Sequence, residues 1–201
     1  MGQIIISVGR EFGSGGRVIA EELAKRFGIP IYDRHLILEI AEKTGLAPEL
    51  IEKYNENPKT RIISRNVRGY SNSIEDNIAE MQFRFIEEKA ASGESFVVVG
   101  RCSESKLRKY DNLVSFFILG DMEEKIKRVM EVYDLSEDKA EELIAKKDKK
   151  RKRYHNYHCS AHWGDSRLYD ICINSSRLGI DRTVDILEDY IRMRKLRMEN
   201  L

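Results

Sequence analysis

Residues 9–17 (GREFGSGGR) have the types and spacing of a loop that binds phosphate. Gly13, Gly15 and Gly16 have no Cβ, so the backbone there can approach an anion closely and direct its N–H groups at it. The loop follows residues 3–8 (QIIISV), a short β-branched run, and precedes an apolar pattern with helical spacing. This position between strand and helix favours a phosphate cradle over glycines that only form a tight turn.

The loop differs from the usual G-x-x-x-x-G-K-[ST] motif, in which the lysine meets the β- and γ-phosphates and the hydroxyl holds magnesium. Aligning residues 13–15 with the G-x-G of that motif puts Gly16 at the lysine position and Arg17 at the hydroxyl position. Arg10 or Arg17 can supply the missing positive charge, although neither copies the geometry of lysine. Magnesium would then be held mostly by phosphates and water, with Ser14 as a candidate ligand.

Strand and helix patterns alternate along the rest of the chain. Five apolar runs predict strands: residues 3–8, 29–32, 95–99, 113–119 and 171–174. Amphipathic stripes between and after these runs predict helices, and the long polar helix that begins near Ser136 is expected to fray near Gly164. The alternation predicts an α/β fold with a parallel sheet of about five strands between helices, and ligands beyond the carboxyl ends of the strands.

The region between the second and third strand patterns is less regular. Asp33 is placed to cap a helix that ends at Gly45, and Pro48 is placed to begin another short helix. Residues 55–72 show no steady period and are expected to form an irregular connection. The capping-box spacing at residues 73–76 predicts a helix that ends before Gly93.

Composition excludes several classes of protein. Lys and Arg number 35 against 34 Asp and Glu, so the chain has no overall basic field and anion binding must be local. The apolar runs are much shorter than a membrane span, and the amino terminus has no signal-peptide pattern, so we expect a cytoplasmic protein without membrane partners. Three cysteines are too few for a secreted disulfide framework. The 201 residues are expected to form one domain.

Four segments carry a family resemblance: residues 9–20 (GREFGSGGRVIA), 31–34 (IYDR), 97–101 (VVVGR) and 169–179 (YDICINSSRLG). In this order, over nearly the whole chain, the sequence resembles the cytidylate kinase-like family, a divergent branch of the nucleoside monophosphate kinases. The resemblance implies a three-layer P-loop kinase fold with a helical acceptor-binding insertion at about residues 33–92 and a lid at about residues 146–165.

The resemblance also implies an acceptor site. By this resemblance, Asp33 and Arg101 contact the monophosphate substrate. The guanidinium group of an arginine can bind a phosphate through two parallel hydrogen bonds. The alternatives are a helix cap for Asp33 and a surface ion pair for Arg101. Two positions depart from the family, because Cys102 replaces an aspartate and Glu75 stands where a base-contacting arginine is expected.

The family's lid pattern, R-D-x-x-D-x-x-R, is only partly kept in residues 147–154 (KDKKRKRY), where Asp148 remains. Positive charge survives, and lid cations can neutralise charge on a transferring phosphoryl group. The candidates in the lid, which join Arg17 as expected catalytic residues, are Lys147, Lys150, Arg151 and Arg153. A solvated helix face and a nucleic-acid-binding patch are the alternatives for residues 146–153.

Four residues have spacing i, i+3, i+4 and i+7, which invites a metal hypothesis: His155, His158, Cys159 and His162. Four ligands on one straight helix cannot easily converge on a tetrahedral ion, so we expect no protein metal site. Neighbouring aromatic residues favour an aromatic surface near the nucleotide instead: Tyr154, Tyr157 and Trp163.

The function that these residues predict is ATP-dependent phosphoryl transfer, with Mg²⁺, to a nucleoside monophosphate or a related small acceptor. Such an acceptor is already an anion and requires no general base. The alternative is a non-catalytic nucleotide-binding or regulatory protein, which the missing lysine favours. Small-molecule nucleotides are the expected partners; nucleic acid is not expected, and a homodimer is compatible with the sequence.

Overall fold

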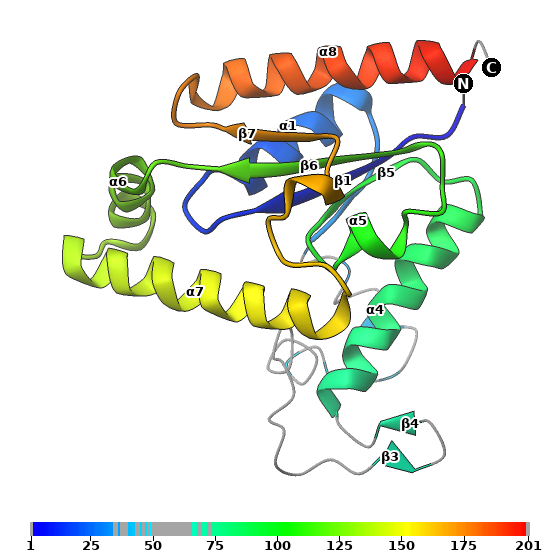
Figure 1. Ribbon diagram of the computed structural model, residues 1–201, viewed down its shortest axis with the longest axis horizontal. Helices are drawn as coiled ribbons and strands as arrows, with labels where there is room; N and C mark the ends of the chain where they lie inside the picture. The colour runs from blue at the N-terminus through cyan, green and yellow to red at the C-terminus, as the bar shows by residue number, and fades with distance from the viewer. Residues whose placement is uncertain are drawn as a thin grey trace.

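The computed structural model describes residues 2–33, 36, 40–42, 45, 47, 49, 66–67, 70–71 and 74–199 (Figure 1). Its main sheet has five parallel strands in the order β2 (Ile31–Tyr32), β5 (Phe96–Val99), β1 (Ile5–Arg10), β6 (Leu113–Leu119) and β7 (Ile171–Asn174). The predicted α/β fold with about five parallel strands is therefore confirmed.

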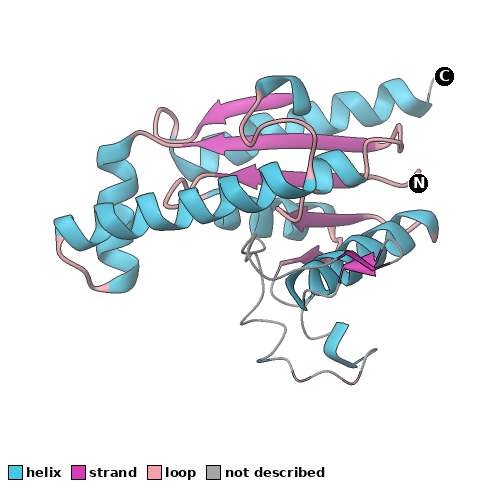
Figure 2. Ribbon diagram, turned by 60° about the horizontal axis from the view of Figure 1, so that its bottom comes forward, coloured by secondary structure: helices cyan, strands magenta, loops and turns pink. Residues whose placement is uncertain are grey.

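Helices cover both faces of this sheet (Figure 2). They are α1 (Gly16–Phe27), α4 (Ile74–Ala91), α5 (Ser103–Lys106), α6 (Met122–Tyr133), α7 (Glu137–His158) and α8 (Gly179–Glu199). In the described ranges, no helix has both the length and the apolar composition that crossing a bilayer requires.

The central strand β1 explains the three layers, because its successive side chains point to opposite faces. Ile6 and Val8 pack in a core cluster with apolar residues of α1 and α8. Ile5, which the alternation directs to the opposite face, packs in a second cluster with Phe85 of α4 and Phe96 of β5. All of these side chains are nearly inaccessible to solvent. A strand buried on both faces needs helices on both sides, as its apolar run indicates.

Two predicted features differ from the structure. The polar helix α7 ends at His158 instead of fraying near Gly164, because Cys159 takes an extended conformation (φ −125°, ψ 149°) and the chain then turns so that Trp163 packs on Phe117. Within residues 55–72, β3 (Asn66–Val67) and β4 (Tyr70–Ser71) form an antiparallel pair. Two-residue strands are too short to show an alternating pattern.

The parallel strands bring distant loops to one edge of the sheet. The glycine-rich loop follows β1, Asp33 follows β2, and Gly100 follows β5 at the carboxyl ends of neighbouring strands. The helices α6 and α7 cross at a steep angle, and their apolar contacts include Val129 and Ile144 (Figure 1). The helix predicted to begin at Pro48 and most of the helix predicted after Asp33 lie outside the described residues.

Candidate active site

The glycine-rich loop has a conformation that side chains would disrupt. Gly13 and Gly15 have φ angles of 82° and 77°, in the left-handed region that favours glycine. A Cβ on Gly15 would overlap the side chain of Ile180, and one on Gly13 would lie 3.1 Å from Cβ of Lys125. The loop leads directly into α1, whose amino-terminal N–H groups and dipole favour an anion. The expected phosphate cradle is thus geometrically present.

The Ser14 hydroxyl supports this loop from inside. It donates to the Glu11 carbonyl oxygen at 2.9 Å and accepts from the Gly16 N–H at 3.4 Å. Ser175, after β7, donates to the Ser14 carbonyl at 2.6 Å. Because Ser14 is fully buried and turned toward its own backbone, its hydroxyl does not face the cleft as a magnesium ligand would.

A cleft of about 460 Å³ opens beside the loop, lined by residues from the sheet edge, α1, α6 and α7. Its described lining includes seven cationic side chains and two carboxylates, so it has the charge to hold several phosphate groups. The lining residues are Arg10, Glu11, Phe12, Gly13, Gly15, Arg17, Val18, Asp33, Arg101, Arg128, Val129, Val132, Tyr133, Lys147, Lys150 and Arg151.

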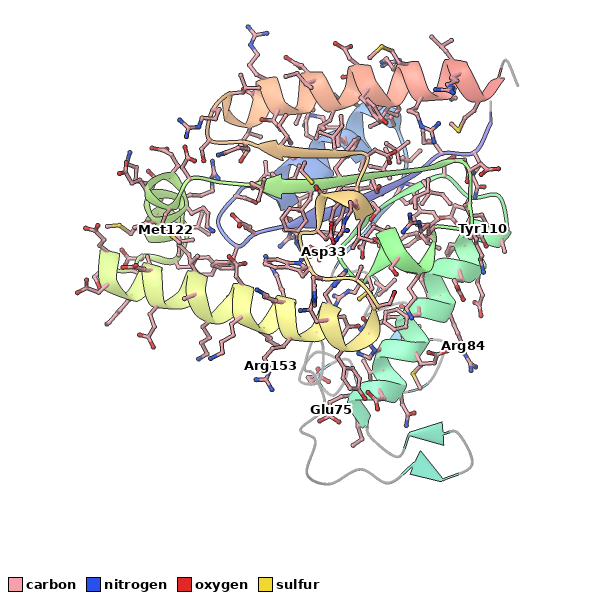
Figure 3. The ribbon with its side chains drawn as sticks, viewed as in Figure 1. Asp33, Glu75, Arg84, Tyr110, Met122 and Arg153 are labelled. Carbon is pink, nitrogen blue, oxygen red and sulfur yellow. The ribbon has the colours of Figure 1, made fainter. Side chains whose placement is uncertain are left out.

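The cleft gathers most of the side chains predicted to bind or act. Nine predicted residues line it: Arg10, Gly13, Gly15, Arg17, Asp33, Arg101, Lys147, Lys150 and Arg151. Among the predicted residues that the structure describes, Ser14, Gly16 and Arg153 do not. The side chain of Arg153 is exposed and points away from the sheet (Figure 3). Residues two apart on a helix do not share a face, so Arg151 and Arg153 separate.

Residues of α6 are the part of the site that sequence patterns missed. Arg128 donates to the Gly13 carbonyl at 2.6 Å and lines the cleft. Val132 and Tyr133 also line the cleft, and they are 67% and 50% exposed, unlike core residues. One feature of the sequence could have indicated these residues: α6 follows β6, and the carboxyl end of β6 lies at the same edge of the sheet as the loop. The amphipathic pattern of α6 by itself indicated only that one face packs against the protein.

The two residues predicted to contact the acceptor both line the cleft, after the neighbouring strands β2 and β5. The Asp33 carboxylate pairs with Nε of Arg17 at 3.1 Å, and its side chain is 14% exposed. Arg101 is 4% exposed, which excludes the alternative of a surface ion pair. Glu75, in the first turn of α4, does not line the described part of the cleft.

Arg101 lies in an unusual turn after β5. Gly100, Arg101 and Cys102 have φ angles of 75°, 61° and 54°, so two residues with side chains hold left-handed conformations. Each such residue costs about 1–2 kcal/mol relative to the right-handed form. Strained backbone of this kind is concentrated at functional sites, where surrounding contacts hold it. A Cβ on Gly100 would overlap the Arg10 guanidinium, and its left-handed φ also favours glycine.

Asp148, the residue of the expected lid pattern that the sequence retains, connects α7 to the glycine-rich loop. Its carboxylate accepts from the Phe12 N–H at 2.7 Å and lies 3.5 Å from Nζ of Lys125. Lys125 is buried and also pairs with Glu11 at 3.0 Å. Burial raises the pKa of Asp148, while the Phe12 N–H and Lys125 oppose that rise. The same carboxylate therefore links lid, α6 and loop.

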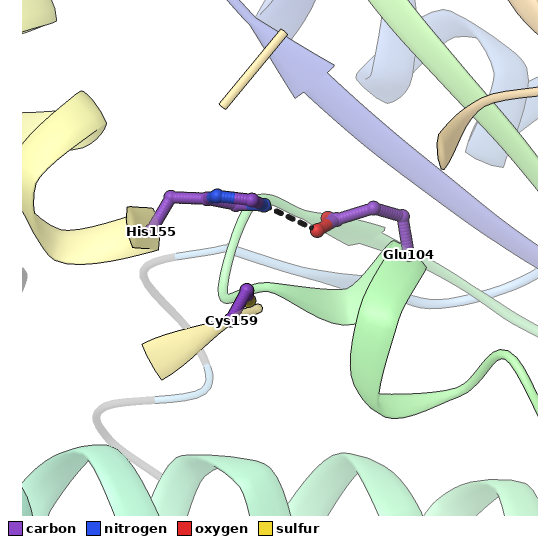
Figure 4. A group of neighbouring side chains, drawn as sticks. All are labelled: Glu104, His155 and Cys159. Atoms are coloured by element: carbon purple, nitrogen blue, oxygen red, sulfur yellow. Dashed lines mark hydrogen bonds and ion pairs between the residues drawn. The ribbon is translucent and has the colours of Figure 1, made fainter. Parts of the chain in front are cut away.

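A second group of polar side chains lies under the turn that carries Arg101 (Figure 4). His155 Nε2 and Glu104 Oε1 are 2.7 Å apart, and both residues are buried. Cys159 adjoins them and packs in one cluster with Cys102. Cys102 and His155 lower the pKa of the Cys159 thiol. Burial alone would lower the pKa of His155, but Cys159 and Glu104 raise it.

The spacing of four metal-type residues along one helix does not persist in the fold, because α7 ends before Cys159. His158 instead packs against the rings of Tyr154 and Phe83, with centroid separations of 4.6 and 5.3 Å. Of the predicted aromatic surface, Tyr154 and Trp163 line a small pocket beside Arg101.

The five-stranded parallel sheet flanked by helices, with its glycine-rich turn after β1, defines an α/β P-loop kinase fold. Shikimate kinases share it: the enzyme from Bacteroides thetaiotaomicron has a TM-score of 0.53 at 14% identity, covering 94% of this chain and 98% of that chain. The Acinetobacter baumannii enzyme in complex with shikimate has a TM-score of 0.53 at 15% identity, covering 98% and 96%. At these identities the likeness concerns the fold alone.

The chain belongs to the cytidylate kinase-like family, which it matches over residues 5–177. It is 28% identical over 193 residues to a cytidylate kinase from Thermococcus kodakarensis, covering 94% of this chain and 89% of that protein. A crystal structure of an uncharacterized protein from Eubacterium ventriosum is 40% identical, with a TM-score of 0.74 over 94% of this chain and 99% of that chain. Family and fold together support a nucleotide kinase-like role.

Proposed function

We propose that this protein transfers the γ-phosphoryl group of ATP, with Mg²⁺, to a nucleoside monophosphate or a related small acceptor. The observation that carries this proposal is the cationic cleft, in which the glycine-rich loop, Arg101 and the lid cations of α7 share one cavity. Phosphoryl transfer depends almost entirely on positioning and on stabilising charge, and these groups supply both.

The loop side of the cleft would bind the donor. Backbone N–H groups around Gly13 and Gly15 and the start of α1 would hold the phosphates. Gly16 provides no ammonium group, so guanidinium groups must supply the charge. Arg17 and Arg128 line the cleft on either side of the loop and are suited to that role.

The opposite side would bind the acceptor. Arg101 is held by its left-handed turn, so its guanidinium loses little freedom on gripping a phosphate through a bidentate fork. Asp33 can accept hydrogen bonds from a sugar or base and also aligns Arg17. Lys147, Lys150 and Arg151 would neutralise charge on the group in transit.

Magnesium would supply positive charge that offsets the negative charge of the donor phosphates. The carboxylates in the described lining are Glu11 and Asp33, and each already pairs with a cation. The Ser14 hydroxyl donates a hydrogen bond to the Glu11 carbonyl oxygen within the loop. These residues fit an ion held mainly through phosphate and water, with at most one direct carboxylate ligand.

A second candidate function is non-catalytic nucleotide binding. The observation that favours it is Gly16, which stands at the position of the P-loop lysine. The ammonium group of that lysine normally contacts the β- and γ-phosphates. The retained acceptor-side arginine in a strained turn favours catalysis, because a protein that only binds ATP has no need of it.

The test is an ADP-release assay with ATP and Mg²⁺ against a panel of ribo- and deoxyribonucleoside monophosphates. Arg101→Ala should lower kcat/KM by about 10²–10³, the usual effect of removing one charge-stabilising group. Arg153→Ala is the matched control, because this arginine belongs to the lid helix but is exposed and points away from the sheet. It should retain activity within about twofold.

Calorimetric measurement of ATP binding separates the two functions. Turnover on one or two acceptors, lost in Arg101→Ala and kept in Arg153→Ala, would support phosphoryl transfer. Measurable ATP binding with no turnover on any monophosphate would reject that acceptor class and support a binding protein.

A further inference from the structure

Two segments far apart in the sequence bring metal-type donors together beneath the turn that carries Arg101. Glu104 comes from α5, whereas His155 and Cys159 come from the carboxyl end of α7. Their carboxylate, imidazole and sulfur donor atoms all lie within 4.8 Å of one another (Figure 4). Cys102, two residues before Glu104, packs in the same side-chain cluster as Cys159. A second sulfur therefore adjoins the three donors.

Burial distinguishes this cluster from a chance group of surface residues. Glu104 and Cys102 are each 3% exposed, His155 is 4% exposed, and Cys159 is half-buried. Acidic side chains are seldom fully buried unless they are paired or coordinate a metal. A divalent cation would offset the negative charge that a carboxylate and thiolates bring into a site with little access to water.

The distances suit a tetrahedral ion after small movements. Zinc bonds of about 2.0–2.3 Å place neighbouring donor atoms roughly 3.3–3.7 Å apart. The separation between His155 Nε2 and Glu104 Oε1 is 2.7 Å and must widen, whereas the Cys159 sulfur lies within 4.8 Å of both other donors. Displacements of about 1 Å or less achieve this.

The objection to four ligands on one straight helix does not apply to this arrangement. His155 and Cys159 are four residues apart, and Cys159 follows the last helical residue in an extended conformation. Glu104 and Cys102 approach from a different element. Ligands that come from two segments can surround an ion. Ligands along one face of a single helix cannot.

We propose that Glu104, His155 and Cys159 form a Zn²⁺ site, with Cys102 as the fourth donor. A set with sulfur, nitrogen and oxygen donors favours zinc over magnesium or calcium, which prefer oxygen ligands. Such an ion would tie the end of the lid helix α7 to the turn that holds Arg101. The site does not depend on the proposed phosphoryl transfer and is tested without measuring activity.

The first experiment measures metal binding by purified, reduced protein under anaerobic conditions. Elemental analysis after incubation with Zn²⁺ and desalting should give about one equivalent for the wild type. Titration with Co²⁺ should produce thiolate-to-cobalt charge-transfer absorption and the visible bands of a tetrahedral ion. Cys159→Ser should abolish that charge-transfer signal or weaken it strongly and lower zinc affinity at least tenfold. Cys172→Ser, which removes an exposed thiol of β7, should match the wild type.

A second measurement covers the risk that a variant folds poorly. Zn²⁺ should raise the unfolding midpoint of the wild type and of Cys172→Ser, and this shift should shrink in His155→Gln and Glu104→Gln, each compared with its own metal-free form. Substoichiometric zinc in the wild type would overturn the proposal. Equal zinc affinity in Cys159→Ser and Cys172→Ser would also overturn it.

Discussion

Replacing Lys125 by methionine should loosen the attachment of the lid helix to the glycine-rich loop. The Lys125 ammonium lies 3.0 Å from Glu11 in the loop and 3.5 Å from Asp148 in α7. Methionine keeps most of the side-chain volume but removes the ammonium between the two carboxylates, which among the described residues leaves Asp148 only the more distant Arg151, at 3.9 Å. Asp148 would still accept from the Phe12 N–H.

The magnitude follows from the exposure of the three groups. Removing one partner of a fully buried ion pair costs about 3–5 kcal/mol. The Lys125 side chain is 5% exposed, but those of Glu11 and Asp148 are 24% and 17% exposed, so water partly screens the carboxylates left behind. We expect a loss of about 2–3 kcal/mol in the free energy of unfolding. For a chain of this size that lowers Tm by about 5–10 °C.

The assay is thermal and urea unfolding of Lys125→Met beside Lys127→Met. Lys127 lies on the same helix and pairs with Glu124 at 2.6 Å, but both side chains are well exposed, so its loss should cost less than about 0.5 kcal/mol. A double-mutant cycle of Lys125→Met with Asp148→Asn should give a coupling energy of about 1–2 kcal/mol. Equal Tm values for the two lysine variants, or additive effects in the cycle, would refute this account of the lid attachment.

Two further predictions concern the loop and the far end of the sheet. Gly15→Ala should weaken ATP binding and destabilise the fold more than Gly28→Ala does; both glycines have positive φ, but a Cβ at Gly15 overlaps a side chain of α8 whereas Gly28 has open space. Equal unfolding free energies would contradict this. Burial opposes ionisation of Glu94, but hydrogen bonds from Tyr32 and Lys89 outweigh it and lower its pKa. Its stabilising effect is therefore present above the ordinary glutamate pKa of about 4.3. As pH falls below that value, the stability difference between wild type and Glu94→Gln, measured by urea unfolding, should shrink; a difference independent of pH would count against the bond.

Much of the fold and part of the site could be predicted from local patterns. The β-branched run that became β1 and the glycines at positions 13 and 15 carry their information in neighbouring residues, because strand burial and left-handed turns depend on local sequence. The parallel sheet then requires that loops after neighbouring strands meet. Arg101 and Asp33 were therefore brought to the cleft as expected.

The tertiary structure decided which side chains meet across distant segments. Arg128 and Arg151 line the cleft, whereas Arg153 does not, because the rotation of each helix is set by packing. The contact of Glu104 with His155 joins residues 51 apart in the chain and has no local signature. A helix stripe shows that one face is buried, but only the packed fold determines which element covers it and which polar groups are trapped between them.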